Sequence, residues 1–130
     1  MIVNVTPDIQ KSESLRKMAE ITLERLGKTD MEKYPSNTLV DYYDAIHKLL
    51  EAITIKRGIK IKGEGAHQEL IDYAAKKQII DEESRKFLQQ MRDYRNRIYY
   101  EGFMVHSNYT KLNKERIKKI IKNLFNRFGM

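Results

Sequence analysis

The chain has 130 residues, of which 41% are hydrophobic and 33% charged, with a formal net charge of +7. It contains no cysteine, which excludes disulfides, thiolate nucleophiles and cysteine-bound metals. Only 6 glycines and 2 prolines interrupt many helix-forming residues, so the composition predicts one all-α domain over residues 1–130.

The first predicted helix begins at "VTPDIQ", where Thr6 is the expected N-cap and Pro7 the first helical residue. Apolar residues recur from there at helical spacing until Gly27, a typical C-terminal stop. Before it, the N-terminus has no basic leader with an apolar core, and no apolar run is long enough for a membrane span. We therefore expect a cytoplasmic protein with no membrane partner.

The second helix is predicted to begin between Ser36 and Thr38, with Thr38 and Asp41 as a capping box. Its apolar stripe continues to Ile53 without a break. The stretch "IKRGIKIKGEGA" alternates isoleucine and lysine. Because a lone strand would have nothing to pair with, we interpret this stretch as a loop.

Three more helices complete the chain. The third covers about 66–77, and the fourth is capped by Asp81 and ends at Gly102. The fifth follows "FMVHSNYTKL" and carries the stripe Ile117 to Phe128. Short loops between helices of this length predict an antiparallel, up-and-down bundle of four to five helices.

The three histidines do not form a metal-binding pattern. His47, His67 and His106 lie in separate segments, without the His-x-x-x-His or Glu-x-x-His spacing that directs two ligands at one ion. His47 has acidic residues one turn before and after it, which favours an ion-pair ladder over an acid–base site. His67 is expected to hydrogen-bond locally. We predict no metal and no cofactor.

Two basic surfaces are candidates for contact with a polyanion. The final helix has seven basic residues against a single acidic one, and it could be a solvated face or a phosphate-binding face. The second candidate is "QQMRDYRNRIYYEGF", with three arginines and three tyrosines at the end of the fourth helix. The basic residues of the final helix are Lys111, Lys114, Arg116, Lys118, Lys119, Lys122 and Arg127.

Helical spacing places Arg95 beside the apolar stripe of the fourth helix, whereas Arg92, Asn96 and Tyr99 or Tyr100 form the neighbouring row. A guanidinium next to apolar surface needs a planar anionic or carbonyl partner, because an unpaired buried charge is expensive. That partner could be structural, from Asp44, Glu51 or Asp93, or it could be a phosphate. The pattern alone leaves both options open.

Together, "YYDAIHKLLEAITIKRG", "GAHQELIDYA" and "MRDYRNRIYYEGF" resemble the HEPN superfamily of small prokaryotic helical domains. The resemblance covers about 38–125. It implies a four- to five-helix bundle that forms a homodimer, with two copies of the arginine-bearing helix facing each other across a cleft. Active members of the family are metal-independent ribonucleases, many are toxins paired with a minimal nucleotidyltransferase antitoxin, and others are thought to bind nucleotides.

By this resemblance, Arg95 matches the family's arginine and Asn96 its polar neighbour, while Tyr100 stands where a histidine is expected. A phenol, with a pKa of about 10 against about 6.5 for imidazole, is poorly suited to general-base work at neutral pH. His106 lies beyond Gly102, too far along to replace the histidine without special loop geometry. The expected function is therefore binding of nucleotide or RNA phosphate in a dimer cleft, without efficient cleavage.

In that hypothesis the ligand-binding residues are Arg92, Arg95, Asn96, Tyr99 and Tyr100. One alternative is an active ribonuclease toxin that uses Arg95 with Tyr100 or His106 as catalytic residues. The other is a non-catalytic helical interaction module, in which the arginine and tyrosine cluster serves interface packing and capping.

Overall fold

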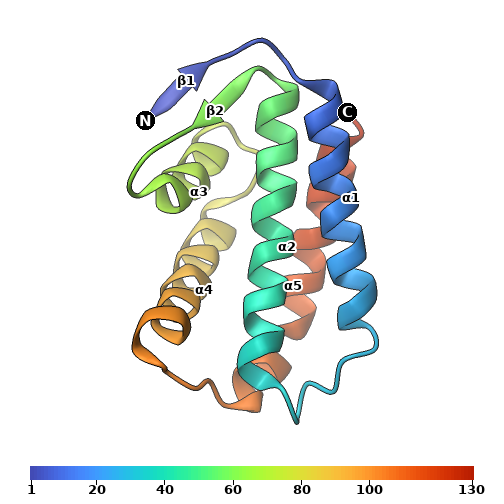
Figure 1. The fold of residues 1–130 in the computed structure, drawn as a ribbon, viewed down its shortest axis with the longest axis vertical. Helices are drawn as coiled ribbons and strands as arrows, with labels where there is room; N and C mark the ends of the chain where they lie inside the picture. The colour runs from blue at the N-terminus through green and yellow to red at the C-terminus, as the bar shows by residue number, and fades with distance from the viewer.

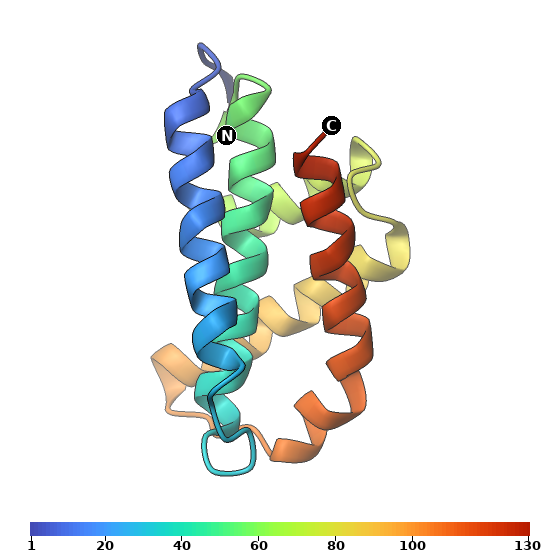
Figure 2. The ribbon, with the colours of Figure 1, turned by 90° about the vertical axis from the view of Figure 1, so that its right-hand side faces the viewer.

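The computed structural model describes residues 1–130 as an all-α bundle with one very small sheet (Figure 1). The chain descends along α1, returns along α2, descends through α3 and α4, and returns along α5. Figure 2 shows α4 crossing the bundle obliquely, while α1, α2 and α5 run side by side. The elements are β1 (Ile2–Asn4), α1 (Ile9–Leu26), α2 (Pro35–Lys56), β2 (Ile59–Ile61), α3 (Ala66–Lys76), α4 (Glu82–Glu101) and α5 (Ser107–Phe128).

Helix α2 is the centre of the fold and packs against the other four helices. Its apolar residues were predicted to form an unbroken stripe, and the structure buries nearly all of them. Alanines on the facing surfaces bring α1 close to α2: Ala19, Ala45 and Ala52 are fully buried. The buried Ser12 hydroxyl also donates to the Ala52 carbonyl at 2.7 Å. This central position fixes the side chains of α2 in space.

The loop prediction for "IKRGIKIKGEGA" was wrong over Ile59–Ile61. These residues form β2, which pairs antiparallel with β1 in the register Ile2↔Ile61. The partner strand comes from the N-terminus, a long-range pairing that local pattern does not reveal. Gly58 precedes β2 with φ +77°, and a Cβ there would lie 2.7 Å from the Val5 carbonyl oxygen. The close approach of these two segments therefore requires glycine at this position.

Three predicted helix starts also differ from the structure. Asp8, not Thr6, caps α1 by accepting from the Lys11 backbone N–H at 2.9 Å. Helix α2 begins at Pro35, so Thr38 lies inside its first turn and forms no capping box. Helix α5 begins at Ser107, inside the segment expected to be a loop, because the His106 imidazole accepts from the Asn108 backbone N–H at 3.1 Å.

The predicted limits of α4 are confirmed. The Asp81 carboxylate accepts from the Ser84 backbone N–H at 2.7 Å, and Gly102 ends the helix in the left-handed conformation with φ +67°. Both signals come from residues close together in the sequence, which is why the sequence alone could predict them. None of the five helices combines the length and the hydropathy that a membrane span requires.

Candidate functional site

The side chain of Arg95 lies at the edge of the core between α4 and α2, as its spacing predicted. It is 21% exposed, and its Nε is 3.6 Å from Asp44 Oδ1, too far for a hydrogen bond. Its Nε–H is buried without a hydrogen-bond partner, and Nη1 donates to Asn96 Oδ1 at 3.3 Å. Asp44 is thus the nearest of the three carboxylates that the sequence offered. The guanidinium keeps most of its donors free.

Only some of the other predicted ligand-binding residues contact Arg95. The Tyr99 ring lies under the guanidinium, with its centroid 4.5 Å from Arg95 Cζ, and Arg92 Nε donates to Gln89 Oε1 at 2.8 Å. Tyr100 is 81% exposed and forms no hydrogen bond with the rest of the chain. The structure therefore brings Arg95, Asn96 and Tyr99 together and leaves Tyr100 outside the group.

A second polar group, which sequence reasoning did not assemble, joins α2 to the first turn of α3. The imidazoles of His47 and His67 stack with ring centroids 3.8 Å apart. His47 Nδ1 is 2.8 Å from Glu51 Oε1, and the Tyr43 hydroxyl is 3.1 Å from His67 Nδ1. Of the predicted ion-pair ladder, the pairing of His47 with Glu51 is confirmed, whereas His47 forms no ion pair with Asp44. The prediction of a local partner for His67 was wrong, because Tyr43 lies 24 positions away.

The two groups are continuous, and we call them together the polar cluster. Tyr43 connects them, since its ring centroid is 6.0 Å from Arg95 Cζ and 6.0 Å from the His67 ring. The four-residue spacing of Tyr43, His47 and Glu51 on α2 was visible in the sequence, but the packing of α3 and α4 against α2 was not. The polar cluster comprises Tyr43, Asp44, His47, Glu51, His67, Arg92, Arg95, Asn96 and Tyr99.

Burial and charge shift several pKa values within the polar cluster. Burial raises the pKa of the Asp44 carboxyl even though Arg95 opposes the shift. Burial also raises the pKa of Tyr43, which keeps its hydroxyl protonated. At Glu51, burial is outweighed by the His47 hydrogen bond, and the pKa falls. Burial, followed by the nearby His47 and Arg95, lowers the pKa of His67 to about 4.

These shifts predict a loss of stability in mild acid. Between pH 6.5 and 4 the unfolded chain takes up a proton on His67 that the folded chain refuses, so stability falls as the pH drops through this window. From pH 7 to 4.5, the wild type should lose on the order of 1 kcal/mol more than His67→Phe, allowing for solvent screening. Urea unfolding at both pH values measures this. An equal loss in both proteins would contradict the assignment.

A pocket of about 240 Å³ adjoins the histidine end of the polar cluster, and we call it the histidine pocket. Its walls come from α1, α2, β2 and α3. The polar lining consists of His47, His67, Glu51, Lys11 and Lys60, with Thr54 beside them, and aliphatic side chains complete it. Because β2 and α1 both contribute, this pocket could not be predicted while the β1–β2 pairing was unknown.

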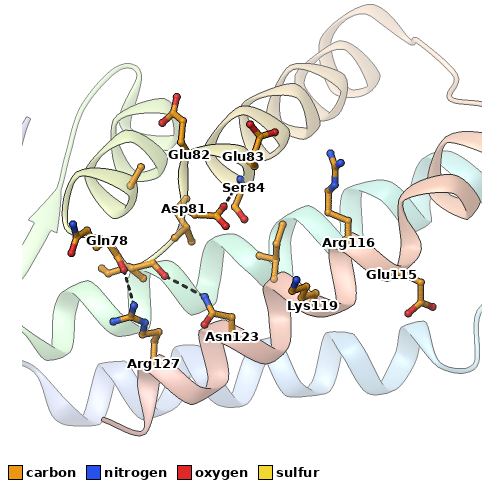
Figure 3. Close-up of a pocket in the computed structure, with 14 residues that line it drawn as sticks. Gln78, Asp81, Glu82, Glu83, Ser84, Glu115, Arg116, Lys119, Asn123 and Arg127 are labelled. Atoms are coloured by element: carbon orange, nitrogen blue, oxygen red, sulfur yellow. Dashed lines mark hydrogen bonds between the residues drawn. The ribbon is translucent and has the colours of Figure 1, made fainter.

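A larger groove of about 860 Å³ lies between the α3–α4 turn and α5 (Figure 3). Two of its polar side chains bond across it: Arg127 donates to the Gln78 carbonyl at 2.9 Å and Asn123 to the Ile79 carbonyl at 3.4 Å. Four acidic residues, Asp81, Glu82, Glu83 and Glu115, line it against three basic ones. This balance disfavours an anion, so we place the candidate site at the polar cluster despite its smaller pocket.

The remaining sequence candidates have structural explanations of different strength. His106 caps α5 and is exposed, and it forms no hydrogen bond with the polar cluster. On α5, Lys111 pairs with Glu32, and Arg116 Cζ lies 5.1 Å from the Phe87 ring centroid. Lys118, Lys119 and Lys122 are exposed and form no ion pair. A phosphate-binding role for this face stays a prediction.

No group of three or more histidine, cysteine or acidic side chains is arranged to hold a metal ion. Comparisons with protein-family models, with curated proteins and with solved structures gave no match. The resemblance to the HEPN superfamily accordingly stays a prediction from the sequence.

Proposed function

We propose that this protein binds the phosphate groups of RNA or a nucleotide at the α4 end of the polar cluster, in a cleft between two copies of the chain, without efficient cleavage. Arg95 is the principal phosphate ligand, with Arg92 beside it. Asn96 orients the guanidinium, and Tyr99 supplies a ring face for a base or sugar. The predicted membership of the HEPN superfamily agrees with this proposal but does not carry it.

The observation that carries the proposal is the incomplete pairing of the Arg95 guanidinium, whose Nε–H is buried without a hydrogen bond and whose single hydrogen bond runs from Nη1 to Asn96. A buried N–H without a partner is rare in folded proteins and requires an explanation. Asp44 forms an ion pair with Arg95, but at 3.6 Å its carboxylate is too far to accept a hydrogen bond from Nε. Two oxygens of a tetrahedral phosphate can accept parallel hydrogen bonds from a planar guanidinium, and the Nη groups of Arg95 and the neighbouring Arg92 can donate them together.

The proposed dimer is supported by apolar side chains exposed around the α4–α5 turn. Tyr100, Met104 and Leu112 are each more than four-fifths exposed. Pairing of two chains there would cover them and bring two Arg95 side chains towards one cleft. Sedimentation velocity with the wild type and with Tyr100→Asp/Leu112→Asp provides the measurement that separates dimer from monomer.

The test of binding compares two double variants that each remove two positive charges. Arg92→Gln/Arg95→Gln should weaken binding of single-stranded RNA by about 100-fold, since each charged hydrogen bond contributes about 1.5–3 kcal/mol. Lys118→Gln/Lys122→Gln, on α5, should change it by about twofold through long-range charge alone. Fluorescence anisotropy over a salt series gives both affinities and the number of phosphates neutralised.

The two sets of variants also discriminate between the candidate surfaces. A large loss in the α5 variant with none in the α4 variant would move the phosphate site to the basic final helix and end this proposal. Absence of RNA and nucleotide binding by the wild type would leave the interaction-module alternative. The predicted nucleotidyltransferase partner is checked separately, by asking whether a neighbouring reading frame encodes one.

Metal-independent RNA cleavage is a second candidate, because the structure supplies imidazoles that the α4 motif lacks. His47 and His67 lie next to Tyr43 in the same polar cluster as Arg95, whereas His106 is used as a helix cap. Incubation of the binding samples with RNA in EDTA tests this candidate. Cleavage that disappears in His47→Ala and persists in His106→Ala would establish it over simple binding.

A further inference from the structure

We infer that the bound strand extends along α2 to a second phosphate subsite in the histidine pocket, formed by Lys11, Lys60 and His67. This inference rests on the proposed function, because it takes the phosphate site at Arg92 and Arg95 as one end of the track. It adds the substrate class: a single-stranded oligonucleotide of several residues rather than a mononucleotide.

The charges of the histidine pocket favour an anion. Lys11 on α1 and Lys60 on β2 are exposed, and neither side chain forms an ion pair. The only carboxylate that lines the pocket is Glu51, which is already engaged by His47 Nδ1 at 2.8 Å. Two uncompensated ammonium groups therefore flank a cavity of about 240 Å³.

His67 adds a directed hydrogen-bond donor to this subsite. The Tyr43 hydroxyl is 3.1 Å from His67 Nδ1 and has no other acceptor, so we assign the hydroxyl as the donor and Nδ1 as the acceptor. The ring proton of the neutral imidazole must then lie on Nε2. This Nε2–H has no partner within the protein, yet His67 lines the pocket. It can donate to a phosphate oxygen without becoming charged.

The spacing between the two ends suits a short strand. Asp44 lies beside Arg95 and Glu51 lies in the histidine pocket, seven residues apart on α2. A helix rises 1.5 Å per residue, so the two ends are separated by about 10 Å along the axis. A stacked strand advances about 3.4 Å per nucleotide and covers this distance in about three steps.

The test measures binding as a function of oligonucleotide length. Uridine monophosphate and oligouridylates of two to six nucleotides are titrated against the full chain by isothermal titration calorimetry. We expect affinity to rise at least tenfold between one and four nucleotides. Lys11→Gln/Lys60→Gln should abolish that rise while leaving mononucleotide affinity within about twofold. The matched control, Lys17→Gln/Lys76→Gln, removes two exposed lysines from α1 and α3 and should keep the full rise.

Each result has a separate meaning. A rise with length that survives Lys11→Gln/Lys60→Gln overturns the second subsite but leaves the Arg95 site intact. Affinity that does not depend on length, with mononucleotide binding still lost in Arg92→Gln/Arg95→Gln, has the same consequence. If the wild type binds no oligonucleotide of any length, both this inference and the proposed function fail. All four substituted lysines are exposed, so loss of folding does not confuse the comparison.

Discussion

Arg95→Glu should reduce the affinity for single-stranded RNA by at least about 100-fold. The substitution removes the main phosphate ligand and places a second carboxylate beside Asp44, whose pKa burial already raises. Two carboxylates at the binding position repel a phosphate and forfeit the charged hydrogen bonds, each of which contributes about 1.5–3 kcal/mol. Anisotropy of a labelled oligonucleotide at constant salt measures the effect.

Arg97 provides the matched control two positions away. Its guanidinium lies 4.1 Å from the Phe103 ring centroid and its Nε is 3.3 Å from Glu101 Oε2, so it belongs to the C-terminal end of helix α4 and not to the polar cluster. Arg97→Glu makes the same charge change on the same helix. We expect it to weaken binding by about threefold at most. Equal losses in both variants, with unaltered circular dichroism, would reduce the role of Arg95 to general charge.

Leu49→Ala should lower the free energy of unfolding by about 3–5 kcal/mol. Leu49 is fully buried on α2, where it belongs to the main hydrophobic core. Truncation of a core leucine loses its transfer free energy and leaves a cavity that helices on several sides cannot all move to fill. A loss of this size is a large part of the 5–15 kcal/mol that stabilises a typical domain. Urea unfolding followed by circular dichroism measures it.

Met18→Ala is the corresponding control, because Met18 lies on α1, is 48% exposed and is outside the proposed dimer surface. Its effect on unfolding should be within about 0.5 kcal/mol. If Leu49→Ala costs less than about 1 kcal/mol, α2 is not the rigid centre that the fold indicates. The placement of Tyr43, His47 and Glu51 by α2 would then need to be reconsidered.

The helices could be predicted because their signals are local. The apolar stripe of α2, the Asp81 cap and the Gly102 stop each depend on residues within a few positions of one another, and all three agree with the structure. The strand β2 could not be found this way. Its hydrogen-bond partner is β1, more than fifty residues earlier in the chain, and without that partner Ile59–Ile61 resembles a loop.

The same distinction between local signals and long-range packing applies to the candidate site. The position of Arg95 beside the core followed from the period of one helix, and the pairing of His47 with Glu51 followed from the spacing on another. The stacking of His47 on His67 and the Tyr43–His67 hydrogen bond required the packing of α3 on α2. The sequence interpretation offered His106 only as an alternative catalytic residue and did not predict that it caps the helix that follows it.

The uneven burial of α2 and α4 has a consequence for hydrogen exchange. Helix α2 contains 13 buried residues, whereas the buried residues of α4 are Phe87, Leu88 and Met91, all in its first half. Amides of α2 should therefore exchange only through global unfolding, while those after Met91 exchange through local opening. The half of α4 that carries Arg95 can thus change its position around a bound strand, while the α2 residues of the polar cluster stay fixed.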